Sequence, residues 1–382
     1  MSVSTRSAPT TSRPAAPPLT AAVPYLPALT GVRAVAAYMV YLHHFNPFHE
    51  GPGLSGFLYD LVLEFHVGVP LFFVLSGFLI TLRYAGTEQW TRGWWGRYLR
   101  NRVARIYPMF FLLTTFYFGV RYFQEGVFAF RTWLFNVTFL RGFFDEYKYT
   151  GIPQGWTLTV EECFYLFAPV AFALLRRRPR LLWALPVALV AFGSLLVLTL
   201  GRLEHHGLFG NFRFMLLFTF FGRAVEFFAG IQLALWFRQG QLRAPRLPGL
   251  LTTAGLVLMA AVVLALVWVR GPYAYGQEHP VGIALNNVAL PAGIVLLFAG
   301  LLTEATWLRG LLSTKLLQLL GRSSYVFYLI HLGLVQELLK QYVTTSSAGL
   351  FLLLNAVAIG LYYLVEQPLN RWLRAPSLAE QA

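Results

Sequence analysis

The sequence predicts an all-α fold: a polytopic membrane helix bundle of about ten transmembrane helices, with both the N- and the C-terminus in the cytoplasm. The 382 residues are 57% hydrophobic and only 12% charged, and the mean hydropathy is +0.57, which is too apolar for a soluble globular protein. The apolar residues occur in runs of about 20, the length that crosses a bilayer core as a helix. Basic residues gather in alternate loops, which is the charge pattern of cytoplasmic loops.

Ten apolar runs follow one another along the chain. They are residues 28–47, 60–82, 104–122, 157–175, 181–200, 215–237, 248–269, 281–303, 323–341 and 347–366. The segment 128–144 is aromatic but contains two arginines, so we interpret it as an interfacial or re-entrant piece. A count of eleven spans stays open.

The two ends of the chain lack such runs. Residues 1–24 are rich in Ser, Thr, Pro and Ala and have no apolar central region, so they fit a disordered cytoplasmic tail rather than a signal peptide. Residues 25–370 then form one membrane domain, and residues 371–382 form a short cytoplasmic C-terminal tail.

The basic residues fix the orientation. With the N-terminus inside, 20 of the 30 Lys and Arg residues lie in inner segments, eight lie in outer segments, and Arg33 and Arg223 fall within spans. The net charge of +14 therefore reflects topology, and we expect membrane lipids rather than nucleic acid as partners. The single Cys163 and the absence of zinc-ligand spacing predict no metal site.

The first span, "GVRAVAAYMVYLHHF", carries ionisable residues at both ends. Arg33 and His44 are eleven residues apart, which places them on one helix face about 16 Å apart along the axis. This face offers a cation at the cytoplasmic mouth and an imidazole toward the outer half, where desolvation would keep it neutral and suited to act as a general base. The alternative is that Arg33 snorkels and His44 is an interfacial histidine. His43 points about 100° away and is more easily explained as structural.

The fourth span opens with "GWTLTVEECFY". Thr159 and Glu162 fit a helix capping box, which makes Glu162 structural. Glu161 lies in the outer half of its helix, at the depth expected for His44, so it could orient that imidazole or stabilise its charge.

Arginines cluster at the inner end of the third span in "RNRVARIYP". Arg102 and Arg105 share a face at a spacing of three residues and could clamp phosphate groups. The competing interpretation is that the cluster only sets topology.

Two further spans contain polar pairs. Arg223 and Glu226 lie one turn apart in "GRAVEFFAG", either as a self-neutralising structural pair or as part of a site. Ser76 and Gly77 in "FFVLSGFLI" indicate close helix packing more than a nucleophile.

The ninth span places polar side chains along "GRSSYVFYLIH". Tyr328 and His331 can share a face, as a hydrogen-bonded core pair or as the lining of a polar cavity that also includes Tyr325.

These stretches together resemble the integral-membrane acyltransferase family 3, the bacterial membrane O-acyltransferases. The matching pieces are "LPALTGVRAVAAYMVYLHHF", "GVPLFFVLSGFLIT", "RNRVARIYP", "GWTLTVEECFY", "RAVEFFAGIQLAL", "LGRSSYVFYLIH" and "LVEQP". They run in the family's order and cover roughly residues 25 to 370. The serine expected after Trp156 is Thr157 here, which keeps the hydroxyl.

The resemblance implies a membrane acyltransferase domain in the bacterial inner membrane. Its donor would be cytoplasmic acyl-CoA, most simply acetyl-CoA, and its acceptor a hydroxyl of a cell-envelope glycan or lipid-linked sugar. Arg33, Arg102 and Arg105 would hold donor phosphates. His44 would deprotonate the acceptor or carry the acyl group, with Glu161 supporting it.

The remaining polar residues would line the substrate cavity. They are Trp156, Ser76, Arg223, Glu226, Tyr325, Tyr328 and His331.

Two alternatives stay open. The acceptor could be a small natural product such as a macrolide, or the protein could be a non-catalytic glycan transporter or flippase, which also needs intramembrane polar groups. Some family members carry an extra extracytoplasmic domain that completes transfer. We expect this chain to act alone or to hand the acyl group to a separate extracytoplasmic transferase.

Overall fold

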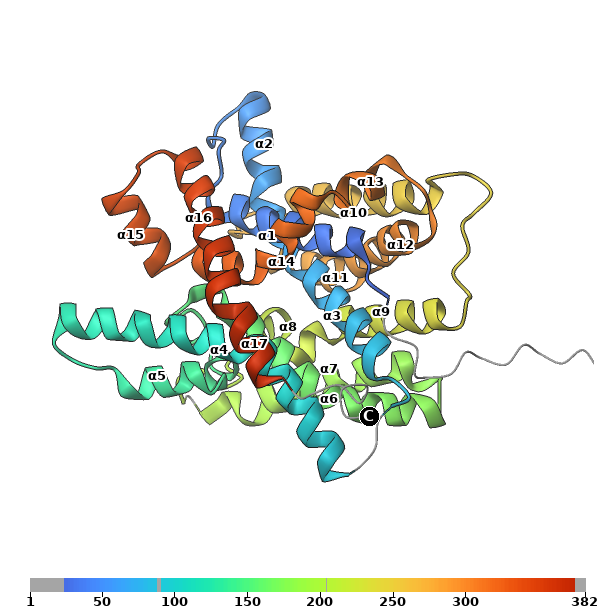
Figure 1. Ribbon diagram of the computed structural model, residues 1–382, viewed down its shortest axis with the longest axis horizontal. Coiled ribbons are helices and arrows are strands. Elements are labelled where there is room, and N and C mark those ends of the chain that lie inside the picture. Colours follow the sequence, from blue (N-terminus) through green and yellow to red (C-terminus); the bar gives the residue numbers. More distant parts are fainter. Residues whose placement is uncertain (1–23, 88–90, 204, 375–382) are drawn as a thin grey trace, which may run out of the picture.

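The computed structural model describes residues 24–87, 91–203 and 205–374, and helices form nearly all of its regular structure (Figure 1). The all-α prediction is confirmed: within these ranges the only β pairing is one isolated bridge between Phe144 and Leu208. The tail predicted at 1–24 lies outside the described residues except for Pro24. The same holds for residues 375–382 of the predicted C-terminal tail.

The helices follow one another along the whole described chain. They are α1 (Pro27–His44), α2 (Gly53–Leu63), α3 (Gly68–Tyr84), α4 (Arg92–Glu125), α5 (Phe130–Val137), α6 (Trp156–Arg177), α7 (Leu181–Thr199), α8 (Phe212–Phe218), α9 (Phe220–Arg238), α10 (Leu250–Val269), α11 (Pro280–Ala284), α12 (Leu290–Thr303), α13 (Trp307–Leu312), α14 (Lys315–Ile330), α15 (Leu334–Tyr342), α16 (Ser347–Leu361) and α17 (Gln367–Leu373). A 3₁₀ turn at Glu64–Val67 joins α2 to α3, and π-helical turns at Leu285–Ala289 and Tyr362–Glu366 join α11 to α12 and α16 to α17.

Eight helical segments of the described chain are long and apolar enough to cross a membrane. They are Gly53–Tyr84, Arg92–Glu125, Pro153–Arg177, Leu181–Leu203, Phe212–Arg238, Leu250–Val269, Pro280–Thr303 and Ser347–Leu373. These segments correspond to eight of the ten predicted spans. The other two predictions fall on α1 and α14, which are less apolar and pack against each other inside the bundle.

The predicted span 323–341 is wrong as a single helix. Helix α14 ends at Ile330, Gly333 adopts a φ of 94°, and α15 starts at Leu334 as a separate, amphipathic helix. A left-handed backbone cannot continue a right-handed helix, so the chain turns at this glycine. The segment 128–144 forms α5 and a 3₁₀ turn, and eight residues reach only about 12 Å, so it makes no eleventh span.

Glycines allow the central helices to approach closely. A Cβ on Gly77 of α3 would lie 2.1 Å from the carbonyl oxygen of Phe227, and one on Gly230 of α9 would lie 2.1 Å from that of Val74. No side chain fits at either position, which confirms Gly77 as a helix-packing residue. The neighbouring Ser76 is left to face the other way, into the bundle.

Two helix-internal prolines leave carbonyl groups without an intrahelical donor, and neighbouring helices supply one. Pro169 has no N–H for the carbonyl of Tyr165, which instead accepts a hydrogen bond of 2.6 Å from the hydroxyl of Tyr98. Pro108 frees the carbonyl of Ala104 in the same way, and the side-chain amide of Asn370 donates to it at 2.9 Å. The prolines therefore join α4 to α6 and α17 to α4.

The predicted capping box at Thr159 and Glu162 is not formed. Helix α6 already begins at Trp156, so Thr159 lies inside it and its hydroxyl donates to the carbonyl of Phe139 at 2.9 Å. The preceding 3₁₀ turn, Pro153–Gly155, moves the helix start upstream of the expected cap.

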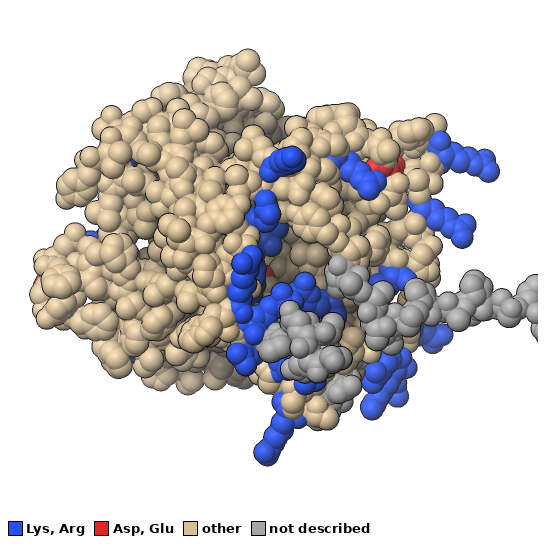
Figure 2. Space-filling model, in the orientation of Figure 1, with Lys and Arg blue, Asp and Glu red and all other residues tan. Residues whose placement is uncertain are grey.

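The charge asymmetry predicted from the sequence is visible on the surface. Figure 2 shows Lys and Arg side chains gathered on the right and lower middle of this face, with hardly any on the left, where Figure 1 places α5 and α15. The ten expected spans, including those on α1 and α14, would run alternately from the basic side to the other side and back. The arrangement agrees with a basic cytoplasmic side and an outer side formed by α5 and α15.

Candidate active site

A cavity opens on the basic side of the bundle, where Figure 2 shows basic side chains bordering a hollow. We call it the vestibule; its volume is about 310 Å³. Four arginines line it, from four different helices: Arg33 of α1, Arg83 of α3, Arg105 of α4 and Arg322 of α14. Convergent guanidinium groups favour binding of phosphate or another polyanion.

A second, smaller cavity of about 80 Å³ lies further inside, and we call it the chamber. Arg33 and Leu79 line both cavities, so the two meet at these residues. The polar side chains that line the chamber are Arg33, Ser76, Thr157, Glu161, Ser324, Tyr325 and Tyr328. Predictions from four separate sequence stretches therefore converge on one space.

Arg33 marks the passage between the cavities. It is half-buried, and its Nε lies 3.4 Å from the hydroxyl of Ser324, which itself donates to the carbonyl of Gly321 at 2.8 Å. The small Gly321 permits this approach of α14 to α1, because a Cβ there would lie 1.9 Å from the carbonyl oxygen of Thr30. Close packing of α1 on α14 thus positions the Arg33 guanidinium.

Glu161 supplies the negative charge of the chamber. Its Oε1 accepts hydrogen bonds from the hydroxyl of Ser76, at 2.5 Å, and from the hydroxyl of Tyr165. The expected pairing with His44 is not formed, since Ser76 and Tyr165 are the hydrogen-bond partners that Glu161 has. Glu161 instead lines the same cavity as Arg33, because helical spacing alone does not identify which helix packs opposite a residue.

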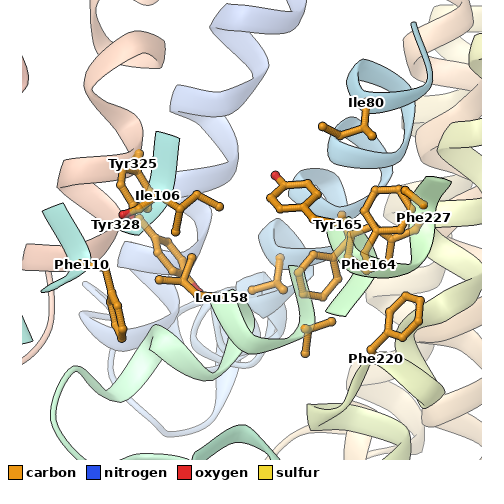
Figure 3. Close-up of a cluster of buried hydrophobic side chains, with 14 of the residues drawn as sticks. Ile80, Ile106, Phe110, Leu158, Phe164, Tyr165, Phe220, Phe227, Tyr325 and Tyr328 are labelled. Carbon is orange, nitrogen blue, oxygen red and sulfur yellow. Dashed lines mark hydrogen bonds between the residues drawn. The ribbon is translucent and has the colours of Figure 1, made fainter. Parts of the chain in front are cut away.

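The tyrosines of α14 form the wall of the chamber nearest α4 and α6. Figure 3 shows Tyr325 and Tyr328 on one side with Ile106, and Leu158 next to Tyr328. The Tyr325 hydroxyl donates to the carbonyl of Ile106 at 2.6 Å, and the Tyr328 hydroxyl lies 3.1 Å from that of Thr157. Thr157 thus provides the hydroxyl expected after Trp156.

The two arginines of the expected phosphate clamp separate. Arg105 faces the vestibule and forms an ion pair with Glu366, in the π-helical turn between α16 and α17. Arg102 is buried, donates to the hydroxyl of Tyr84 at 3.3 Å, and lies over the rings of Tyr84 and Tyr165. It lines neither cavity, because neighbours on one helix face at a three-residue spacing can still contact different helices.

Arg223 and Glu226 form the self-neutralising pair that was one of the two predicted options. Arg223 Nε donates to Glu226 at 2.9 Å, and its Nη1 donates to Asn287 at 3.1 Å, beside the π-helical turn of α11 and α12. Both residues are fully buried and neither lines the vestibule or the chamber. Trp156 also lies outside both cavities and packs against Phe218.

Histidines gather at the outer end of α1. The ring centroids of His44 and His331 are 5.6 Å apart, and those of His43 and His44 are 4.7 Å apart. His44 is the last residue of α1 and is exposed, which differs from the buried imidazole expected. His331 connects this group to the chamber, because its ring lies 5.5 Å from that of Tyr328.

Several residues near the vestibule were not predicted from the sequence as part of a site. Arg83 and Arg322 were counted only as topology signals, and Glu366 only as part of "LVEQP", although the structure places all three around the vestibule or on its arginine. For Arg83 and Arg322 the sequence did offer a signal: each is a basic residue at the cytoplasmic end of a predicted span that also contains a polar motif.

Arg141 was also missed. It is fully buried in the outer loop and donates to Asn136 at 2.6 Å and to the carbonyls of Thr150 and Ile152. Burial lowers the pKa of this guanidinium to about 9. Its hydrogen bonds hold the outer loop against the start of α6, where a Cβ on Gly155 would lie 2.0 Å from Arg141 Nη2.

A membrane helix bundle with a basic mouth, a polar chamber and a group of imidazoles offers an anion-binding site and candidate general bases, which suit an enzyme that transfers a group from an anionic donor. Comparison with known families agrees, because a family model described as an acyltransferase domain matches residues 26–366. The chain belongs to this family, acyltransferase family 3, and is an O-acyltransferase-type enzyme. The flippase alternative is thereby set aside. Within the described residues, no group of three or more His, Cys, Asp or Glu side chains is placed to hold a metal ion.

Several relatives carry related names. The chain is 27% identical to Acyltransferase MdmB of Streptomyces mycarofaciens, over 91% of this chain and 92% of that protein. It is 27% identical to the putative peptidoglycan O-acetyltransferase YrhL of Bacillus subtilis, over 80% of this chain and 48% of that protein. It is 26% identical to O-acetyltransferase OatA of Staphylococcus aureus, over 46% of this chain and 30% of that protein. The chain thus spans about half or less of the last two relatives. No solved structure matches it.

Proposed function

We propose that this enzyme moves an acyl group, most simply acetyl, from cytoplasmic acyl-CoA to a hydroxyl of a cell-envelope glycan or lipid-linked sugar, in the bacterial cytoplasmic membrane. The observation that carries the proposal is the polar path from the vestibule, past Arg33, into the chamber and on to His331 and His44. The names of the relatives YrhL and OatA support acetyl as the group and a cell-wall glycan as one acceptor class.

The vestibule fits the nucleotide end of the donor. Its volume, about 310 Å³, lies at the lower end of small-molecule sites, which begin near 300 Å³. Its four arginines would neutralise the donor phosphates, while Arg102 holds α4 against Tyr84 instead. The chamber is too small for a nucleotide, so only a narrow arm carrying the thioester would enter it.

The chamber would guide that arm. Arg33 at its entrance gives the last cationic contact, and Glu161 inside it balances this charge and orders the hydroxyls of Ser76 and Tyr165. We therefore assign Glu161 to the organisation of the chamber rather than to direct support of His44.

His44 would perform the chemistry at the outer end. As a base, an imidazole nitrogen takes the proton of the acceptor hydroxyl, the oxygen attacks the thioester carbonyl, and the C–S bond breaks to release the CoA thiolate, which is then protonated. As a carrier, the same nitrogen attacks first, and the acyl-imidazole then transfers its group to the hydroxyl. Both routes give CoA thiol and an O-acyl ester.

Radiolabelled acetyl-CoA and purified protein test the proposal directly. The acceptors are peptidoglycan fragments, a lipid-linked sugar and a macrolide, each supplied with no second protein. We expect label on one of the sugar acceptors, loss of transfer in His44→Ala, and unchanged transfer in the control His49→Ala, whose side chain is exposed in the outer loop and has no hydrogen-bond partner.

Each other result has a defined meaning. Label on the macrolide alone replaces the acceptor class and keeps the reaction. Label that reaches glycan only when an extracytoplasmic transferase is added establishes the two-protein route. Substantial transfer by well-folded His44→Ala removes His44 from the chemistry.

A further inference from the structure

His331 occupies a closed aromatic pocket between the chamber and the exposed end of α1. Its side chain has 0% of its surface exposed. The rings of Phe327 and Tyr328 lie 5.9 and 5.5 Å from its own, and that of Tyr41 lies 6.4 Å away. Among the described residues, no hydrogen bond or ion pair joins it to a carboxylate, a lysine or an arginine.

The hydrogen bonding of His331 fixes its tautomer. Its Nδ1 lies 2.8 Å from the backbone carbonyl oxygen of Tyr328, and a carbonyl can only accept, so Nδ1 carries the proton. In a neutral imidazole the other nitrogen, Nε2, then holds a free lone pair. This Nε2 is buried and has no hydrogen-bond partner.

A buried acceptor without a partner destabilises the folded state unless a donor reaches it during function. Two neighbours could supply that donor: the Tyr41 hydroxyl, which is itself buried without a hydrogen-bond partner among the described residues, and the imidazole of His44. The ring of His44 is the nearer of the two, with its centroid 5.6 Å from that of His331 against 6.4 Å for Tyr41. Two imidazoles joined by an N–H···N bond have ring centroids roughly 5 Å apart, so the separation of 5.6 Å is close to that of a bonded pair.

We propose that His331 is a positioning residue that accepts a hydrogen bond from His44. The bond holds one nitrogen of His44 protonated and leaves the other with its lone pair directed to the acceptor hydroxyl. When that nitrogen takes up the hydroxyl proton, His44 becomes an imidazolium, and the same bond to His331 stabilises the new charge. His331 thus takes the supporting role first expected of Glu161. This inference rests on the proposed function of His44.

The titratable groups around the pair are few. Tyr41 and Tyr328 face His331, while His43 faces His44. The ring of His43 in turn contacts the rings of His66 and Tyr275. His66 forms a hydrogen bond with the buried Glu64. The nearest carboxylate therefore acts on His66, two rings away from His44.

Two substitutions separate the positioning role from a structural one. In His331→Asn the amide nitrogen can keep the bond to the Tyr328 carbonyl, but nothing replaces Nε2. In His331→Gln the amide oxygen can occupy the place of Nε2, but the bond to the carbonyl is lost. We expect His331→Asn to lower kcat by roughly 100-fold, near the lower limit of what a positioned proton-transfer group contributes, with KM for acetyl-CoA unchanged.

His331→Gln should recover most of that loss. The reverse order, with His331→Asn near wild type and His331→Gln impaired, assigns His331 to structure and overturns the proposal. Thermal unfolding of each variant in detergent reports its folding separately from its kinetics.

The pH profile supplies a second readout. Protonation of His44 removes the lone pair that takes the hydroxyl proton, and protonation of His331 at Nε2 removes the acceptor that holds His44. Log kcat of the wild type should therefore fall with a slope approaching two on the acidic side, and with a slope of one in His331→Gln. Equal slopes in the two proteins contradict the pairing.

Chemical labelling tests the inference independently of turnover. Diethyl pyrocarbonate acylates neutral imidazole nitrogens, and the rate at His44 can be measured by peptide mass spectrometry relative to exposed His49 in the same sample. We expect the His44 rate to fall several-fold in His331→Asn and to return in His331→Gln. An unchanged rate overturns the positioning role even if the wild type transfers no acetyl group, whereas loss of transfer with the expected labelling pattern overturns the proposed function alone.

Discussion

Arg83 and Arg322 are exposed residues at the mouth of the vestibule, on α3 and α14, and they converge there with Arg33 and Arg105. Exposed guanidinium groups bind phosphate more weakly than buried ones because water and salt screen them. Arg83 and Arg322 should therefore each contribute to donor affinity without being essential for the reaction.

Arg322→Gln tests this contribution. We expect KM for acetyl-CoA to rise by about tenfold, which corresponds to about 1.4 kcal/mol and to one charge-assisted hydrogen bond. KM for S-acetyl-pantetheine, which lacks the nucleotide and its phosphates, should not change. An equal rise for both donors would mean that Arg322 shapes the bundle rather than binding phosphate.

Arg102→Gln is the matched control for the same measurement. Its guanidinium is buried against Tyr84 outside the vestibule, so the variant should lower the unfolding temperature and leave KM for acetyl-CoA close to wild type. A raised KM in stable protein would restore Arg102 as a donor ligand.

Individual site residues were predictable from the sequence where a polar side chain in a membrane span would cost free energy unless it had a partner or lined a cavity. Arg33, Ser76 and Tyr328 were selected because polar groups in a membrane need partners, and all three line the chamber. Their neighbours were not predictable, since helical spacing defines a face but not the helix that packs on it. For this reason Glu161 was matched with His44 and Arg102 with Arg105.

At the level of the elements, helix-internal prolines act as connection points between helices. Pro169 of α6 leaves the Tyr165 carbonyl without its helical donor, and the hydroxyl of Tyr98 on α4 donates to that carbonyl instead. A proline in a membrane helix is tolerated when a neighbour supplies the missing donor.

A double-mutant cycle tests this connection. Tyr98→Phe should lower the unfolding free energy by about 1–3 kcal/mol, because it leaves a buried carbonyl unpaired. In a Pro169→Ala background the alanine N–H can bond to the same carbonyl, so Tyr98→Phe should cost clearly less. Unfolding in mixed micelles gives all four stabilities. The same cost in both backgrounds would show that the hydroxyl bond does not compensate for the proline.

Most helices were predictable because a long apolar run that crosses a membrane must satisfy its backbone hydrogen bonds internally, which a helix does. Their interruptions were not, since a hydropathy average does not register a single left-handed residue. The turn at Gly333 within "HLGLV" divided one expected span into α14 and α15, and the glycine itself was the available signal.

For the molecule as a whole, the orientation in the membrane can be measured. In a Cys163→Ser background, Pro52→Cys and Gly93→Cys place thiols at exposed positions beyond opposite ends of the α2–α3 segment. A membrane-impermeant maleimide added to intact cells should modify position 52 and spare position 93, because basic loops stay in the cytoplasm. Position 93 should react after permeabilisation. The opposite pattern would exchange the donor and acceptor sides of the proposed reaction.

The dependence of α1 on α14 has a consequence for biogenesis. Helix α1 enters the membrane first, yet it is not among the segments apolar enough to cross by composition, and Arg33 acquires its Ser324 partner only when a helix almost 300 residues later is in place. The packing of α1 inside the bundle is therefore complete only after the C-terminal helices have been synthesised. A chain that ends before α14 lacks residues that line both cavities, so neither the vestibule nor the chamber can be complete before the C-terminal helices have packed.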